Sequence, residues 1–242
     1  MRQRRHLIVA LIALLMGAAP VSAAPVVERQ RIGRSVNDVR LRAVNIGARS
    51  KPTKVLVVGC IHGNECAGKA ILRELRQMSA PGGFELWLIW SLNPDGQASG
   101  TRQNARGVDL NRNFPAGWRS IGEPWDTYHS GSRAASEPET RAAMRFVEEH
   151  RPDITIWYHQ AMELVTKHKH HRWVQRRYAA RVGLPWVRLD PLPGTATRWQ
   201  NRNYPGHTSF VVELPAGSMS ERSAKRHARA VRAAGREWAA RR

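Results

Sequence analysis

Short apolar runs alternate along this chain with longer segments in which apolar residues recur at helical spacing. The runs have the length of buried strands, and they lie at 54–59, 84–90, 153–158 and 210–212. Segments with the helical pattern lie at 66–78, 137–150 and 172–182, and a last one begins at Ser220. This alternation predicts an α/β fold, in which one domain has a mixed (parallel and antiparallel) central sheet flanked by helices.

One connection is much longer than the others and runs from Asn93 to Ala135. Loops of that length in compact domains are usually functional or disordered. The aromatic residues Trp118, Trp125 and Tyr128 lie within this loop. Their side chains could wall a substrate cleft, or they could anchor the loop to the body of the domain.

The first residues have the pattern of a secretory signal peptide. Arginines at positions 2, 4 and 5 precede an apolar run from Leu7 to Ala19, and Val21-Ser22-Ala23 offers a small-residue cleavage site. The run is shorter than the ~20 residues that a membrane-spanning helix needs. We therefore expect a signal peptide at 1–23, a catalytic domain at 24–242, and a secreted or extracytoplasmic protein with no stable membrane insertion after cleavage.

The formal net charge of the chain is +20, from 39 Lys and Arg against 19 Asp and Glu. A charge of this size attracts polyanions, so a basic protein that binds cell-wall polymers or other polyanions is the non-enzyme alternative. The export signal and the lack of a base-reading motif argue against nucleic acid as the partner. Heavy use of arginine can also reflect a compositional bias of the source genome, with any electrostatic function secondary.

His62-Gly63-Asn64-Glu65 follows the apolar run at 54–59, and it carries the first candidate chemistry. Ligands in open α/β sheets bind at the carboxyl ends of strands, where this segment is expected to lie. Imidazole nitrogen and carboxylate oxygen are both suitable zinc ligands. Taken alone, His62 could be an ordinary loop histidine and Glu65 an acid in the first turn of a helix.

Further motifs follow this one along the chain. They are Leu92-Asn93-Pro94-Asp95-Gly96, Gly107-Val108-Asp109-Leu110-Asn111-Arg112-Asn113-Phe114, Ser136-Glu137-Pro138-Glu139-Thr140, Trp157-Tyr158-His159 and Phe210-Val211-Val212-Glu213-Leu214-Pro215. In these segments and their order the chain resembles the zinc carboxypeptidase family, and within it the compact bacterial murein peptide amidases. The resemblance covers nearly the whole exported chain and implies a zinc carboxypeptidase-like fold.

The resemblance implies that His62, Glu65 and His159 bind one Zn²⁺ per chain and leave a fourth position for water. Glu213 matches the general base of the family, which takes a proton from that water and passes it to the leaving amine. A lone histidine at a strand end is more often hydrogen-bonded than metal-bound, so the assignment of His159 as a zinc ligand depends on the other motifs being present as well.

The same resemblance assigns the polar residues of the long loop. Arg102 matches the arginine that polarises the scissile carbonyl, with Arg106 as the alternative for that role. Asn111 and Arg112 match the pair that grips the free carboxylate of a C-terminal substrate residue. Asp109 matches a carboxylate that accepts the second ring N–H of His62. In a chain so rich in arginine, each of these guanidinium groups could also be solvated surface.

The larger carboxypeptidases carry an active-site tyrosine before the catalytic glutamate, and Tyr204 is only a weak candidate for it here. Cys60 and Cys66 flank the first motif and are the only cysteines. An exported protein can join them in a disulfide, and the alternative is two buried thiols.

We therefore expect a zinc-dependent peptidase that hydrolyses an amide next to a residue with a free carboxylate. The resemblance favours the γ-D-glutamyl–diaminopimelate bond of murein peptides, which makes a cell-wall muropeptide the expected partner. A general metallocarboxypeptidase that acts on C-terminal L-amino acids is one alternative. An aspartoacylase-like deacylase is another, because such enzymes also use H-G-N-E and D-L-N-R segments.

Overall fold

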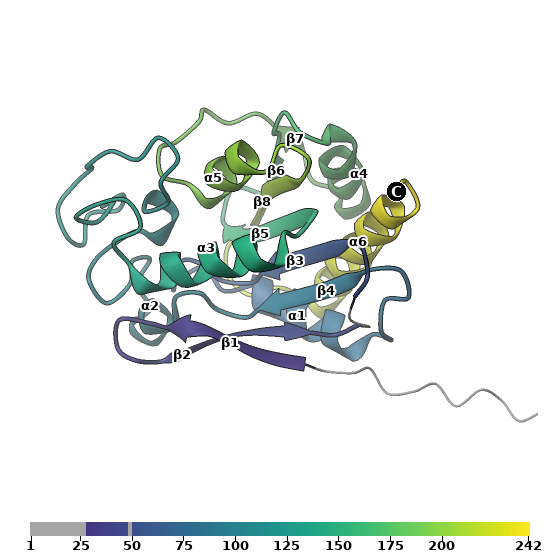
Figure 1. Ribbon diagram of the computed structural model, residues 1–242, viewed down its shortest axis with the longest axis horizontal. Coiled ribbons are helices and arrows are strands. Elements are labelled where there is room, and N and C mark those ends of the chain that lie inside the picture. The colour runs from purple at the N-terminus through teal and green to yellow at the C-terminus, as the bar shows by residue number, and fades with distance from the viewer. Residues whose placement is uncertain (1–27, 48–49) are drawn as a thin grey trace, which may run out of the picture.

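An eight-stranded sheet forms the centre of the computed structural model, which describes residues 28–47 and 50–242 (Figure 1). The strands are β1 (Glu28–Arg34), β2 (Arg40–Asn45), β3 (Lys54–Val58), β4 (Glu85–Ile89), β5 (Ile154–Gln160), β6 (Leu164–Thr166), β7 (Trp186–Val187) and β8 (Thr208–Leu214). Their order across the sheet is β1-β2-β4-β3-β5-β8-β6-β7. The expected signal peptide at 1–23 lies outside the described residues.

The middle of the sheet is parallel and its two sides are mixed. Strand β3 pairs in parallel with β4 and β5, and β5 pairs in parallel with β8. Antiparallel pairs join β1 to β2, β2 to β4 and β6 to β8. The expectation of a mixed sheet flanked by helices is confirmed.

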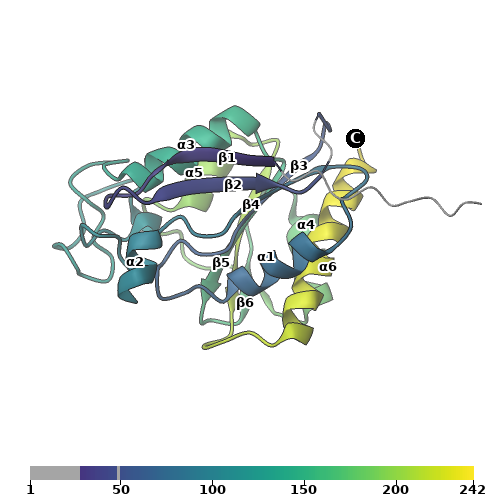
Figure 2. The ribbon, with the colours of Figure 1, turned by 90° about the horizontal axis from the view of Figure 1, so that it is seen from below.

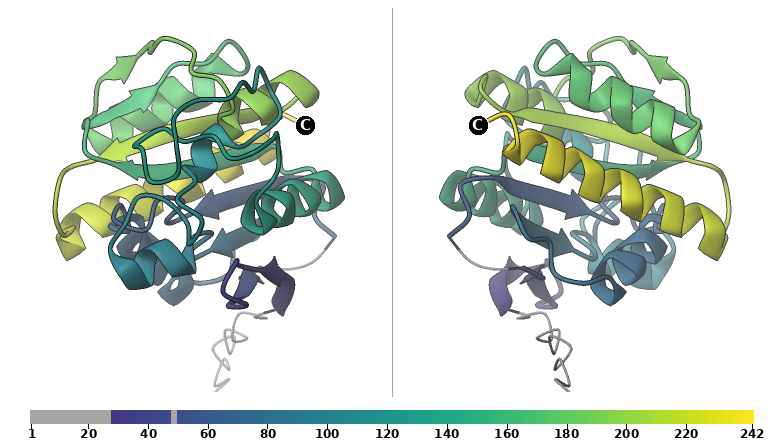
Figure 3. Two further views of the ribbon diagram at one scale, coloured as in Figure 1. Left: turned by 90° about the vertical axis from the view of Figure 1, so that its left-hand side faces the viewer. Right: turned by 90° about the vertical axis from the view of Figure 1, so that its right-hand side faces the viewer.

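Helices cover both faces of the sheet, as Figure 2 shows. One face is covered by α1 (Gly68–Gln77), α4 (Arg172–Val182) and α6 (Glu221–Ala239), and the other by α3 (Pro138–His150) and α5 (Ala196–Asn203). Figure 3 shows α6 crossing the first of these faces. None of the helices in the described part of the chain is both long and apolar enough to span a bilayer.

The central strands are apolar on both sides because each face is packed against helices. In β3, Val55 and Val57 join the cluster beneath α1, α4 and α6, while Leu56 and Val58 join the cluster beneath α3 and α5. These four side chains are at most 1% exposed. Full burial of each such side chain contributes about 1.5–3 kcal/mol, which is why strand β3 is held rigidly beneath the loop that follows it.

Several elements were not expected from the apolar pattern. Strands β1 and β2 carry exposed arginines that alternate with buried residues such as Leu41 and Ala43, so they lack a continuous apolar run. The segment from 93 to 135 is not wholly irregular, because it contains α2 (Pro94–Ser99) and the 3₁₀ turn η1 (Leu110–Arg112). Helix α5 and the short strands β6 and β7 were missed as well.

Candidate active site

The candidate residues meet at the carboxyl ends of the parallel strands β3, β5 and β8. His62 and Glu65 lie in the loop between β3 and α1, His159 is near the end of β5, and Glu213 is near the end of β8. His159 and Glu213 are register partners in adjacent parallel strands, so their side chains lie on the same face of the sheet. The sheet therefore brings together groups that are far apart in the sequence.

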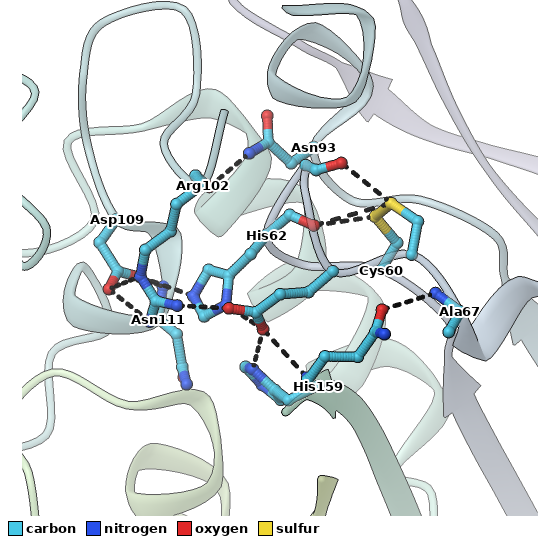
Figure 4. A network of polar contacts seen from close by, with 12 residues as sticks. Cys60, His62, Ala67, Asn93, Arg102, Asp109, Asn111 and His159 are labelled. Carbon is cyan, nitrogen blue, oxygen red and sulfur yellow. Dashed lines mark hydrogen bonds and ion pairs between the residues drawn. A yellow bond between two sulfur atoms is a disulfide. The ribbon is translucent and has the colours of Figure 1, made fainter. Parts of the chain in front are cut away.

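His62, Glu65 and His159 form a group that can hold a metal ion. Their ligand atoms all lie within 4.8 Å of one another. The Nδ1 atoms of both histidines face the same carboxylate oxygen, Glu65 Oε2, at 2.8 Å for His62 and 3.1 Å for His159 (Figure 4). Two imidazole nitrogens and one carboxylate that converge on one point suit zinc, so these residues fit the metal that the sequence predicts.

The protonation of His159 and Glu65 favours metal binding at neutral pH. Burial lowers the pKa of His159 to about 4, which keeps its imidazole neutral. Burial alone would raise the pKa of Glu65, but hydrogen bonds from His159 and His62 outweigh it and hold that pKa well below its usual range. A neutral imidazole and an ionised carboxylate are the forms in which these side chains bind a cation.

Asp109 is fully buried and organises the neighbourhood of His62. Its Oδ1 lies 2.9 Å from His62 Nε2 and accepts a hydrogen bond of 2.8 Å from the Asn111 amide. Its Oδ2 accepts from Nε and Nη2 of Arg102 at 3.1 and 3.0 Å. An ionised Asp109 holds one proton of His62 on Nε2, which makes Nδ1, the nitrogen that faces Glu65, the one that can bind a metal.

Arg102 lies beside the metal-ligand group, as predicted, whereas Arg106 does not. The Nη1 of Arg102 donates to Glu65 Oε1 at 2.5 Å, and its side chain is 20% exposed, so the guanidinium remains within reach of a substrate. Arg106 is exposed and lies 3.8 Å from a carboxylate oxygen of Glu137 instead. The alternative assignment to Arg106 has no geometric support.

Asn111 and Arg112 lie in η1, which contacts the first residue of α5 and the loop before it. Asn111 Oδ1 accepts a hydrogen bond of 3.0 Å from the Ala196 amide, and Arg112 Nη1 donates to the Asn111 carbonyl at 2.8 Å. Gly194 (φ +67°) crosses this segment so closely that a Cβ there would lie 2.0 Å from the Arg112 carbonyl oxygen. Only glycine fits that crossing, which fixes η1 against the loop before α5.

Glu213 has the properties of a proton acceptor. Its Oε2 is buried and has no hydrogen-bond partner among the described residues. Burial, and then repulsion from Glu65, raise the pKa of Glu213 to about 7, although the backbone amide of Met162 hydrogen-bonds the carboxylate and opposes the rise. A carboxylate with a pKa near neutrality and a free oxygen can both accept and return a proton.

Cys60 and Cys66 form a disulfide with Cα atoms 4.7 Å apart, which settles the alternatives left open by the sequence. The disulfide brackets His62 and Glu65 and is visible in Figure 4. The weak candidate Tyr204 lies elsewhere, because its ring stacks on Arg151, which precedes β5. Tyr204 is therefore at the opposite ends of β5 and β8 from His159 and Glu213.

Two side-chain contacts near the site were not assigned from the sequence, although Tyr128 was one of the loop aromatics expected to wall a cleft or to anchor the loop. The side chain of Gln160 accepts from the Ala67 amide at 3.0 Å and donates to the carbonyls of Pro215 and Gly217 at 2.8 Å, so it ties together the segments that carry Glu65, His159 and Glu213. Tyr128 lies over Arg112. Gln160 directly follows a motif and Tyr128 lies in the long loop, and neither position in the sequence indicates these contacts.

Comparison with solved structures supports the fold. The crystal structure of murein-tripeptide amidase from Escherichia coli O157 matches with a TM-score of 0.68 at 24% identity and covers 85% of this chain and 90% of that one. Carboxypeptidase A from Helicoverpa armigera matches with a TM-score of 0.76 at 18% identity, covering 89% of this chain and 69% of that one. Both are likenesses of fold alone.

Similarity in sequence identifies the family. Murein peptide amidase A of Vibrio campbellii is 32% identical over 178 residues, which are 66% of this chain and 68% of the relative. Murein peptide amidase A of Escherichia coli K12 is 29% identical over 152 residues, or 58% of this chain, and the match spans 62% of that relative's length. The family model described as zinc carboxypeptidase matches residues 22–220. The chain therefore belongs to the zinc carboxypeptidase family.

Proposed function

We propose that this protein is an exported zinc-dependent peptidase that hydrolyses the amide before a C-terminal residue with a free carboxylate. The observation that carries the proposal is the convergence of His62, Glu65 and His159 within 4.8 Å, beside a Glu213 whose buried oxygen has no partner. Export rests on the signal-peptide pattern of residues 1–23, and we propose an extracytoplasmic location on that basis.

His62, Glu65 and His159 would hold the zinc, which supplies Lewis-acid activation of water and of the scissile carbonyl. Glu213 accepts a proton from the attacking water and returns it to the leaving amine, so that the C–N bond is replaced by a carboxylate and a free amine. The pKa of about 7 suits both halves of this task at neutral pH.

Arginine and asparagine side chains position the substrate in this proposal. The guanidinium of Arg102 faces the oxyanion that develops on the carbonyl, an interaction worth on the order of 3 kcal/mol per donor. Arg112, supported by Asn111, binds the terminal carboxylate through its planar fork. Asp109 holds both Arg102 and His62 in place through its hydrogen bonds.

The substrate we propose is a murein peptide cut at the γ-D-glutamyl–diaminopimelate bond. Curated relatives from E. coli and V. campbellii are named murein peptide amidase A, and this supports the proposal. In a tripeptide stem, diaminopimelate is the C-terminal residue, so this cut requires the same carboxylate clamp as carboxypeptidase chemistry. A general carboxypeptidase that acts on C-terminal L-amino acids is the alternative, and a match to human mast cell carboxypeptidase A (27% identity over 161 residues) supports keeping it.

Product analysis separates these substrates. The leader-free, zinc-loaded protein would be incubated with murein tripeptide and, separately, with peptides that end in ordinary L-residues, each with and without chelator, and the products identified by mass spectrometry. Chelator-sensitive release of diaminopimelate alone is the expected result. Release of ordinary residues would replace the substrate with that of a general carboxypeptidase, and inactivity on both sets would contradict the proposed function.

A further inference from the structure

Tyr128 lies over Arg112, an arginine of the candidate site that is otherwise buried. The Cζ of Arg112 is 4.7 Å from the centroid of the Tyr128 ring, and the Cζ of Arg102 is 5.8 Å from it. Arg112 is 5% exposed, whereas Tyr128 is 50% exposed. The ring therefore separates the guanidinium of Arg112 from solvent on one side while its own outer surface remains open.

The backbone that follows Tyr128 is anchored to the segment that carries the clamp. The carbonyl of His129 accepts from the Asp109 amide at 2.9 Å, and the carbonyl of Ser130 accepts from Asn113 Nδ2 at 2.8 Å. Nδ1 of His129 is also 2.9 Å from the carbonyl of Gly122. These contacts hold the ring over Arg112 in a fixed place, so the arrangement is built into the loop.

We propose that Tyr128 is a positioning residue that determines affinity for substrates with a free terminal carboxylate. It acts through Arg112, and the inference rests on the proposed function of Arg112 as the carboxylate clamp. A ring stacked on the guanidinium holds the fork in one orientation by the cation–π interaction. By excluding water from that side, it also strengthens the attraction between the fork and a carboxylate.

Two substitutions separate the ring from the hydroxyl. Tyr128→Ala removes the ring and should raise KM for free-carboxylate peptides about tenfold, with kcat nearly unchanged, which is the size expected of a partly desolvated cation–π contact. Tyr128→Phe keeps the stacking surface and should restore the wild-type KM. Neither should change KM for the same peptides with an amidated C-terminus.

Tyr204→Ala is the matched control. Tyr204 also stacks on an arginine, with Arg151 Cζ 4.5 Å from its ring centroid, but this pair lies at the other ends of β5 and β8. Its loss should leave KM for both kinds of peptide unchanged. A Tyr128→Ala change made on top of Arg112→Ala should raise KM no further, because the ring acts only through that guanidinium.

Several outcomes would overturn the inference. Equal effects of Tyr128→Ala on free and amidated peptides would show a merely structural role for the loop, as would a fall in kcat with unchanged KM. A Tyr128→Phe variant as impaired as Tyr128→Ala would assign the effect to the hydroxyl. An additive effect on the Arg112→Ala background would show that the ring acts independently of the clamp.

Calorimetric titration with free diaminopimelate keeps this inference distinct from the proposed function. If the wild type binds that carboxylate but cleaves no peptide, the proposed hydrolysis fails, and the binding constants of the Tyr128 variants still test the ring, with about tenfold weaker binding expected for Tyr128→Ala. Absence of binding and of cleavage by the wild type would overturn both proposals.

Discussion

Replacement of Asp109 by asparagine tests how the site prepares His62 for a metal ion. Asp109 is fully buried, and its two oxygens receive hydrogen bonds from His62, from Arg102 and from the Asn111 amide at 2.8 to 3.1 Å. Asparagine has nearly the same shape but one oxygen and one NH₂ group. In either orientation, therefore, the NH₂ group faces a hydrogen-bond donor.

Each orientation of the amide has a specific cost. With its oxygen toward His62, the NH₂ group meets the guanidinium of Arg102, and two charge-assisted hydrogen bonds are lost. With its oxygen toward Arg102, the NH₂ group meets His62 and favours the tautomer with its proton on Nδ1, the atom that faces Glu65. Loss of such an outer carboxylate typically weakens metal affinity about 10- to 100-fold, and we expect Asp109→Asn to fall in this range.

The assay is equilibrium competition for zinc against a chromogenic chelator at fixed pH, with circular dichroism to confirm that the variant is folded. Asp126→Asn is the control, because Asp126 is an exposed carboxylate of the same long loop that accepts a hydrogen bond from the Glu123 amide at 2.9 Å. It makes the same change of charge away from His62. A zinc affinity for folded Asp109→Asn within twofold of the wild-type value would refute the proposed role of Asp109.

Three further predictions concern the clamp, the disulfide and acid stability. Arg112→Ala should raise KM for free-carboxylate peptides about 10- to 100-fold, as loss of charge-assisted hydrogen bonds implies, and spare amidated peptides in steady-state assays. Replacement of both Cys60 and Cys66 by serine removes the disulfide, whose cysteines are separated by 6 in sequence. The double variant should have a free energy of unfolding lower by about 2 kcal/mol in urea titrations, and an unchanged value would contradict this. Burial lowers the pKa of His227, whose Nδ1 is 2.9 Å from the Tyr178 hydroxyl, to about 4. Above about pH 6.5, His227 is neutral in both the folded and the unfolded protein. As the pH falls toward 4, the unfolded protein takes up a proton that the folded protein does not, and the free energy of unfolding decreases by up to about 3 kcal/mol. Unfolding of His227→Gln should therefore depend less steeply on pH over that range.

The sequence was sufficient to predict the central strands, because both faces of β3, β4, β5 and β8 are buried and leave continuous apolar runs. It also predicted the covering helices α1, α3, α4 and α6, but not α5. It was insufficient for β1 and β2. Their exposed positions carry arginine, and the alternation of Leu41 and Ala43 with Arg40 and Arg42 extends over too few residues to stand out. Strand β2 is held in the sheet by backbone pairing with β4, which the pattern of side chains does not indicate.

Within the site, residue types and motif order predicted which side chains meet but not how they are supported. His62, Glu65, His159 and Asp109 come together as expected from the family resemblance. The ring of Tyr128 over Arg112 depends on the path of a long loop, and local sequence does not determine that path. The same limit explains why the sequence alone does not decide between Arg102 and Arg106 as the arginine that polarises the scissile carbonyl.

Metal content and turnover of Glu213→Gln, measured together, test the central claim most directly. Glu213 is not among the three residues whose ligand atoms converge, so the variant should bind one zinc per chain with wild-type affinity. It should nevertheless lose at least about 100-fold in kcat on a peptide that the wild type cleaves, because it lacks the proton acceptor. Full activity of the zinc-loaded variant would contradict the account, as would wild-type turnover that persists after chelation has removed all metal.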